Sequence, residues 1–323
     1  MAFPELSNLT GLASVLDVVG YNYKEQHYEA DHAKYPSHIV LGTENGHHIE
    51  AWRAVTNNDF IAGQFLWTGI DYLGETQGWP SHGSAAGVMD LAGFEKPAYY
   101  YRQALWSNRP VLQLAAAYPI PDDMPVRAWF NAYKFSWNFV NGETVNIACH
   151  TNCQEVELFL NEVSFGKRVP DNPGMPLMWP VKYSPGVLRA VGYLDGQTVE
   201  CKLLTTGVPV AITATLLDEK LLCDGQDMTH VIFQVVDVFG RPVVDAYDLL
   251  NIKVEGAELL GLENGDLADT TPYSSNSRRL HKGRLLAYIG APAVETDEIC
   301  IRAEGFGLKA VDVVIKTELV RTQ

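Results

Sequence analysis

Residues 39–45, Ile39-Val40-Leu41-Gly42-Thr43-Glu44-Asn45, place an acidic side chain directly after a short apolar run. A run of this kind predicts a strand that is buried on both faces, as in a parallel sheet. In a (β/α)₈ barrel the carboxyl ends of such strands open into the active site, so Glu44 is a candidate catalytic residue. Only 43 residues precede Glu44, whereas a complete barrel needs about 250. The sequence therefore predicts part of a barrel and part of an active site.

The first 110 residues alternate short apolar runs with segments of helical spacing. Strands are predicted at residues 16–23, 38–43 and 61–67, and helices at 25–34, 49–56 and 96–106. Such alternation implies parallel pairing of the strands with right-handed crossovers. Three strand–helix units fit into this length and eight do not, so residues 1–112 are predicted to be a barrel portion.

The pattern changes after Pro110 to short alternating strands, predicted from Val126 onward and separated by Asn-Gly, Asp-Gly and Pro-Gly turns. Asn264-Gly265 is interpreted as one such hairpin turn. Residues 119–123 and 205–209 have the composition of linkers. We therefore expect two antiparallel immunoglobulin-like β-sandwiches, at residues 113–207 and 208–323, and a multidomain chain that combines α/β with all-β parts.

The overall composition is that of a globular protein with a marked excess of acidic residues. Of the 323 residues, 47% are hydrophobic and 20% are charged, and the formal net charge is −15. This charge disfavours nucleic acid and anionic membranes as partners. The sequence contains no run of 18 apolar residues, so no membrane span is predicted. Residues 1–5 lack the basic and apolar features of a secretory signal. The start of the chain does not indicate where the parent protein resides.

No cofactor or metal is expected. The five cysteines form no CxxC pair, and Cys149 and Cys153 are interpreted as small buried hydrophobic residues. The adjacent histidines His47 and His48 would point in different directions, which disfavours a metal site.

Three predicted strand ends carry polar or aromatic side chains suited to sugar chemistry: Asn22 with Tyr23, then Glu44, then Trp67 with Asp71 close behind. A carboxylate can attack an anomeric carbon, and a tyrosine hydroxyl can orient that carboxylate. An indole face can pack on a pyranose ring. Each signal is weak alone, and a lone tryptophan is more often a core residue.

The combination of motifs resembles glycoside hydrolase family 2, and its β-galactosidase-like members in particular. The resemblance rests on LDVVGYNY at residues 16–23, GTE at 42–44, GQFLWTGIDYLGE at 63–75 and KPAYY at 96–100. TNC at 151–153 and VELFLN at 156–161 are similar to the accessory domain that follows the barrel in this family. DGQD at 224–227 and VDVFGRP at 236–242 are similar to the immunoglobulin-like domain after that. The resemblance implies barrel strands six to eight in residues 1–112.

Carried over position by position, the resemblance makes Glu44 the nucleophile and Tyr23 the residue whose hydroxyl orients it. Asn22 lies where some members contact the sugar, and Trp67 matches the tryptophan that lines the sugar subsite. His47 matches a sugar-contacting histidine more loosely.

Three further residues keep open interpretations. His48 competes with His47 for the sugar contact, because Asn45-Gly46 departs from the family's sequence. Asp71 and Glu75 lie just past the third strand and are expected to shape the pocket, with Asp71 as a candidate substrate contact.

The family's general acid/base, a Glu that follows Asn well upstream of the nucleophile, has no counterpart before Glu44. A retaining glycosidase needs both carboxyl groups. The expected partners are therefore a β-galactoside or related glycan and the missing N-terminal domains of the parent enzyme, without which the chain is expected to be inactive or nearly so. The open barrel edges also predict self-association or poor order through residues 1–110.

A non-catalytic carbohydrate-binding or assembly module is the alternative. In that case Trp129, Trp137 and Trp179 of the sandwiches would be exposed and could bind glycan, although burial in a core is the more common role of such residues. The sequence leaves the sugar open between galactose, glucuronic acid and mannose.

Overall fold

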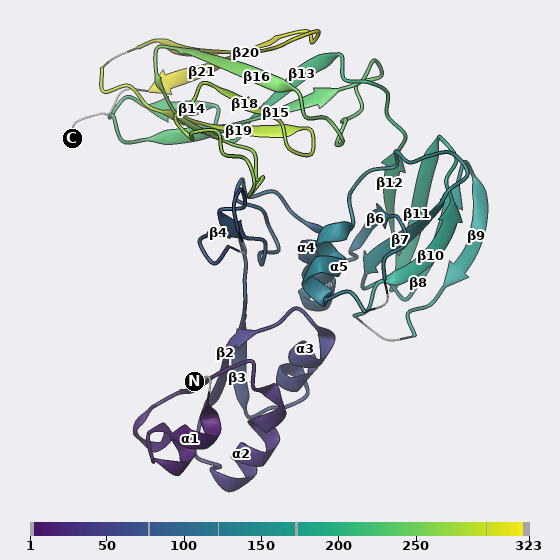
Figure 1. The fold of residues 1–323 in the computed structure, drawn as a ribbon, viewed down its shortest axis with the longest axis vertical. Coiled ribbons are helices and arrows are strands. Elements are labelled where there is room, and N and C mark those ends of the chain that lie inside the picture. The colour runs from purple at the N-terminus through teal and green to yellow at the C-terminus, as the bar shows by residue number, and fades with distance from the viewer. Residues whose placement is uncertain (1–2, 77, 122, 172–173, 295, 319–323) are drawn as a thin grey trace.

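The computed structural model describes residues 3–76, 78–121, 123–171, 174–294 and 296–318. Three parts follow one another along the chain (Figure 1): an N-terminal α/β lobe, a middle pair of sheets and a C-terminal pair of sheets. The described residues form mostly β-strands, with few helices. No helix among the described residues is long and apolar enough to cross a membrane.

The N-terminal lobe is a three-stranded parallel sheet in the order β1-β2-β3. Helices connect successive strands, as the alternating sequence pattern predicts. A small core lies on the sheet around Val19, Tyr21 and Tyr28. The elements of the lobe are α1 (Pro4–Leu9), η1 (Ala13–Val15), β1 (Val19–Asn22), η2 (Glu25–His27), α2 (Tyr28–Lys34), β2 (Val40–Asn45), α3 (Ile49–Thr56) and β3 (Ile61–Leu66).

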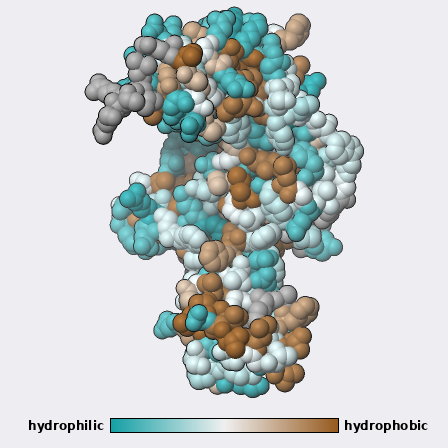
Figure 2. Space-filling view, turned by 90° about the vertical axis from the view of Figure 1, so that its left-hand side faces the viewer, coloured by the Kyte–Doolittle hydropathy of each residue, from teal (hydrophilic) through white to brown (hydrophobic). Residues whose placement is uncertain are grey.

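Much of the lobe's apolar surface is exposed. Figure 2 shows hydrophobic residues gathered over the lower lobe, where Figure 1 places β2 and β3. Phe65 of β3 is 63% exposed, and Leu9 and Val15 are more exposed still. Strands β1 and β3 are the edges of the sheet, so each pairs on one side only.

A short hairpin and a helix connect the lobe to the sheets. The hairpin joins β4 (Tyr72–Leu73) to β5 (Gly83–Ser84), and α4 (Pro97–Trp106) opens with proline in its first turn. Figure 1 places β4 between the lobe and the C-terminal sheets.

The middle sandwich, residues 112–204, packs the sheet β10-β7-β6 against the sheet β12-β11-β8-β9. Its shared core includes Trp137, Trp179 and Leu158. Asp195-Gly196 forms the predicted hairpin turn between β11 and β12, and both residues have positive φ. The strands are β6 (Leu112–Ala117), β7 (Thr144–Thr151), β8 (Glu155–Leu160), β9 (Val163–Arg168), β10 (Leu177–Lys182), β11 (Val187–Leu194) and β12 (Gln197–Leu204).

Two predictions for this part are wrong. Residues from Val126 were expected to be strand, but Val126–Ala132 is the helix α5. Its Trp129 contacts Tyr133, the residue that follows the helix, with tilted rings whose centroids are 4.5 Å apart. Both residues pack near the alanine-rich face of β6 and β7. Residues 119–123, of which Asp122 lies outside the described part, connect β6 to α5 inside the sandwich and do not separate domains.

The C-terminal sandwich, residues 211–318, packs the sheet β13-β15-β19-β17 against the sheet β14-β21-β20-β16-β18. The pair β14–β21 is parallel, whereas only antiparallel pairs were expected. The strands are β13 (Ala211–Leu216), β14 (Lys220–Leu222), β15 (Met228–Val236), β16 (Leu249–Glu255), β17 (Glu258–Glu263), β18 (Ser277–Arg279), β19 (Arg284–Gly290), β20 (Glu298–Gly305) and β21 (Val311–Glu318).

Asn264-Gly265 is not a hairpin turn, contrary to the prediction. It opens a loop of residues 264–276, because the flanking strands β17 and β18 belong to different sheets. Residues 205–209 lie between β12 and β13, the last strand of one sandwich and the first of the next.

Candidate active site

Three of the predicted residues meet at one edge of the parallel sheet. Asn22 is the last residue of β1, Glu44 is the next-to-last residue of β2, and Trp67 follows β3 directly. Because the strands are parallel, their carboxyl ends lie on the same side. Cα pairing sets Asn22 beside Glu44, and the Trp67 amide donates to the carbonyl of Asn45 at 3.0 Å.

A chain of side-chain hydrogen bonds holds the Glu44 carboxylate. Nδ2 of Asn22 donates to Oε1 of Glu44 at 2.7 Å. The hydroxyl of Thr43 donates to Oδ1 of Asn22 at 2.6 Å. Asn22, which was predicted as a sugar contact, therefore holds the Glu44 carboxylate, and Thr43 is a supporting residue that the sequence reasoning missed.

A local irregularity in the sheet makes this chain possible. The register shifts between Tyr21 and Asn22, so that Asn22 pairs with Glu44 and the intervening Thr43 has no Cα partner on β1. The Thr43 side chain occupies the space over Gly20, where an added Cβ would lie 2.5 Å from its methyl carbon. The glycine in Gly20-Tyr21-Asn22 is the signal that could have revealed this packing.

Tyr23 joins Glu44 through the backbone. Its amide donates to the Glu44 carbonyl at 2.7 Å, and its φ of 52° lies in the left-handed region that non-glycine residues seldom adopt. Strain of this kind is concentrated at functional sites. The Tyr23 side chain is 44% exposed at the open edge of the sheet. That its hydroxyl orients the carboxylate stays a prediction.

Trp67 is held by a second chain of side chains. Its indole Nε1 donates to the hydroxyl of Tyr72 at 3.1 Å, and the two rings meet edge to face. The Tyr72 hydroxyl donates in turn to Oε2 of Glu75. Tyr72 had not been singled out from the sequence. With its N–H group bound, the indole is fixed while it remains half-buried.

Asp71 is a buried partner of a lysine and not an open ligand group. It is 4% exposed, and its Oδ1 accepts hydrogen bonds from Lys96 Nζ and from the Gly87 amide, both at 2.8 Å. Burial raises the pKa of Asp71, and the Lys96 ammonium opposes that rise. The carboxylate thus anchors the start of α4 to the segment after Trp67. Its contact with substrate stays a prediction.

His47 is also buried, and its contact with sugar stays a prediction. It is 8% exposed, and its Nε2 lies 2.9 Å from the carbonyl of Ala86, so this nitrogen carries the proton. Its ring packs near Phe130 of α5. The imidazole therefore lies at the contact with the middle sandwich. His48, its competitor, is exposed.

Among the residues that the structure describes, no three His, Cys, Asp or Glu side chains lie close enough together to hold a metal ion.

Two family models match the chain. Residues 212–314 match the glycoside hydrolase family 2 C-terminal domain 5, and residues 142–200 match a domain of unknown function, DUF4982. A β-galactosidase, BoGH2A, from Bacteroides ovatus is 34% identical over 247 residues, which are 75% of this chain.

This chain belongs to glycoside hydrolase family 2.

Other relatives agree with this assignment. A β-glucuronidase from Formosa agariphila is 25% identical over 239 residues, 72% of this chain. The crystal structure of a family 2 member from Bacteroides cellulosilyticus is 27% identical, with a TM-score of 0.87 over 94% of this chain and 42% of its own. The chain spans about a quarter of the curated relatives' length, 27% of BoGH2A and 22% of the β-glucuronidase, and corresponds to a C-terminal portion of a family 2 protein.

The premise of the alternative, exposed sandwich tryptophans that bind glycan, is wrong for two of the three. Trp137 and Trp179 are 0% and 2% exposed and lie in the core of the middle sandwich. Trp129 packs against Phe130 of its own helix and against Tyr133, which follows the helix.

Proposed function

We propose that this family 2 chain carries the nucleophile of a retaining exo-β-glycosidase that hydrolyses terminal non-reducing β-D-galactosides. Glu44 is the nucleophile. The observation that carries the proposal is the 2.7 Å contact between Asn22 and Glu44, because it fixes a carboxylate at the carboxyl end of parallel strands. The 34% identity to the β-galactosidase BoGH2A supports galactose as the sugar.

In the proposed double displacement, the Glu44 carboxylate attacks the anomeric carbon as the glycosidic bond breaks. A covalent glycosyl-enzyme forms, and the leaving oxygen takes a proton from a general acid. Water then attacks the same carbon, gives its proton to the deprotonated acid and releases Glu44. Asn22 holds one carboxylate oxygen so that the other is free to attack, Tyr23 assists, and the face of Trp67 packs on the pyranose ring.

Residues 1–112 are proposed to be strands six to eight of a (β/α)₈ barrel with their crossover helices. Residues 113–207 and 208–323 are proposed to be immunoglobulin-like domains. The parallel order β1-β2-β3 and the two packed sheet pairs support this division.

The general acid/base and the rest of the barrel would come from polypeptide beyond these 323 residues, since no Asn-Glu pair precedes Glu44 in this sequence. Loss of general acid catalysis lowers rates by roughly 10²–10⁴-fold. We therefore expect little or no turnover of a chromogenic β-galactoside by the chain alone. Turnover within roughly tenfold of a complete enzyme, abolished by Glu44→Gln, would contradict this part of the proposal.

Covalent labelling tests the nucleophile without a general acid. The reagent is a 2-deoxy-2-fluoro-β-galactoside with dinitrophenolate as its leaving group. Dinitrophenolate departs without protonation, so no general acid is needed. We expect peptide mass mapping to find the sugar on Glu44 and to lose it in Glu44→Gln. Glu50→Gln, at an exposed carboxylate on α3, is the control and should label normally. Labelling of another residue, or equal labelling of Glu44→Gln, would refute the assignment of Glu44. Faster labelling by the corresponding 2-fluoro-glucuronide than by the galactoside would replace galactose by glucuronic acid as the proposed sugar.

A further inference from the structure

The hairpin β4–β5 begins five residues after Trp67 and extends toward the C-terminal sandwich (Figure 1). Tyr72 pairs with Ser84 and Leu73 with Gly83 at its base. The Gly74 amide donates to the His82 carbonyl at 3.0 Å and extends the hairpin. Because the Tyr72 hydroxyl also accepts a hydrogen bond from the indole N–H of Trp67, a displacement of the hairpin would displace the partner of that indole.

The loop of residues 264–276 in the C-terminal sandwich is here called the docking loop. It contacts this hairpin through hydrogen bonds and side-chain packing. The His82 amide donates to the Leu267 carbonyl at 3.0 Å, and His82 Nε2 lies 3.3 Å from the Tyr273 hydroxyl. The Leu267 side chain covers Gly83 so closely that an added Cβ there would lie 2.7 Å from its Cδ2. These contacts join segments almost 200 residues apart in the sequence.

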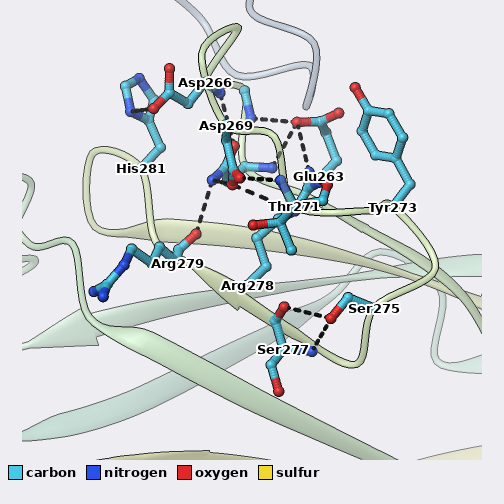
Figure 3. Close-up of polar contacts among 12 residues, drawn as sticks. Glu263, Asp266, Asp269, Thr271, Tyr273, Ser275, Ser277, Arg278, Arg279 and His281 are labelled. Carbon is cyan, nitrogen blue, oxygen red and sulfur yellow. Dashed lines mark hydrogen bonds and ion pairs between the residues drawn. The ribbon is translucent and has the colours of Figure 1, made fainter. Parts of the chain in front are cut away.

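A buried polar network holds the docking loop in shape (Figure 3). Arg278 is nearly inaccessible, and its guanidinium lies 3.7 Å from a Glu263 oxygen and 3.6 Å from an Asp269 oxygen. The same guanidinium donates to the Thr271 carbonyl and lies 4.7 Å from the centre of the Tyr273 ring. The loop is therefore a preformed surface, because its contacts are fixed from within its own sandwich.

We infer that the docking loop positions Trp67 for its sugar, through the hairpin and Tyr72. Leu267 and Tyr273 hold His82 and Gly83, the β4–β5 ladder transmits this restraint to Tyr72, and Tyr72 fixes the indole N–H group. The inference rests on the proposed function in that Trp67 faces the sugar. Tyr72 and Tyr273 are positioning residues in this arrangement.

The indole N–H signals of the seven tryptophans in the ¹⁵N-labelled 323-residue chain provide the test. Trp67→Phe identifies the Trp67 signal by its loss. In Leu267→Ala/Tyr273→Phe we expect that signal to move and its hydrogen exchange to accelerate about fivefold, the equivalent of one net hydrogen bond. Tyr72→Phe, which removes the acceptor directly, should give at least the same change. The other six signals report whether each variant is folded.

The matched control is Val238→Ala/Tyr247→Phe, at exposed positions of the same sandwich outside the docking loop, and it should leave the Trp67 signal unchanged. A Trp67 signal that keeps its position and exchange rate in folded Leu267→Ala/Tyr273→Phe would overturn the inference, as would an equal effect of the control. Should the double variant not fold, the same readings are taken from Tyr273→Phe alone. Covalent labelling separates the two proposals: a response of Trp67 to the docking-loop variants, together with labelling of a residue other than Glu44 by the fluorogalactoside reagent, would keep the positioning role and count against the glycosidase assignment.

Discussion

Asn22 bridges Thr43 and Glu44, with its Nδ2 at 2.7 Å from the Glu44 carboxylate and its Oδ1 at 2.6 Å from the Thr43 hydroxyl. Because a carboxylate only accepts, the amide must turn its Nδ2 to Glu44, and the Thr43 hydroxyl then donates to the Oδ1 on the other side. The nucleophile proposed here is thus oriented by a neutral donor on the neighbouring strand, which adds no second charge beside it.

Replacing Asn22 with Ala should slow covalent labelling of Glu44 by about 10- to 100-fold, because a hydrogen bond to a charged group contributes about 1.5–3 kcal/mol. The measurement is the labelling rate with the fluorogalactoside reagent. Thr43→Ser keeps the supporting hydroxyl and should label at nearly the normal rate. An unchanged rate in Asn22→Ala would show that this contact does not prepare the carboxylate.

Gly20→Ala should destabilise the N-terminal lobe by about 1–3 kcal/mol, because the new Cβ would collide with the Thr43 methyl group. Denaturant unfolding measures the loss. Gly20→Ala/Thr43→Ala should regain most of the stability while losing the hydroxyl that supports Asn22. If the double variant is as unstable as Gly20→Ala, the strain arises elsewhere.

Lys96→Met should lower the free energy of unfolding by about 3–5 kcal/mol, because it leaves the Asp71 carboxylate buried without its cation. Lys96→Met/Asp71→Leu removes both charges and should cost much less. Chemical denaturation of the two variants, compared with the unchanged chain, checks the order. Equal losses in both would mean that packing, and not the unpaired charge, dominates.

His150 should make the protein sensitive to acid. It is fully buried beside Tyr101, Trp129 and Phe130, and burial lowers its pKa to about 3. The unfolded chain takes up this proton below about pH 6.5, so the free energy of unfolding falls as the pH drops from about 6.5 toward 3.

His150→Leu should remove about 2–3 kcal/mol of that loss at pH 4.5, relative to pH 7.5. Part of the sensitivity will remain, because burial also lowers the pKa of His281 to about 4. Denaturant titrations at the two pH values give the comparison. A pH dependence identical to that of the unchanged chain would exclude His150 as its source.

Self-association through the N-terminal lobe is expected from its two open sheet edges and exposed apolar side chains. Light scattering should give a mass that rises with concentration, and Leu9→Ser/Phe65→Ser should reduce the rise. Val208→Ser, at an exposed valine outside the lobe, is the control. A constant monomer mass across the concentration range would contradict the prediction.

The ends of the three N-terminal strands were predictable from the sequence because each apolar run stops at a polar or aromatic residue. These residues are Asn22, Glu44 and Trp67. The role of Asn22 was not, since it depends on a register shift that leaves Thr43 between paired residues. The hydrophobic periodicity of the sequence alone cannot reveal such a register shift.

The burial of Asp71 and His47 could not be predicted, for a different reason. Both follow strands where a ligand group would be expected, but their surroundings come from distant parts of the chain, Lys96 in one case and Phe130 in the other. Helix α5 was missed although Trp129 and Tyr133 are four residues apart, a spacing that favours a helix over a strand.

The contact between the docking loop and the β4–β5 hairpin bears on how chains of this family can be recombined. A C-terminal sandwich attached only by a tether could be exchanged for another without regard to the N-terminal lobe. Here the incoming module would have to bring equivalents of Leu267 and Tyr273, already shaped to receive His82 and Gly83. Chimeras should therefore be selected by the fit of that one loop.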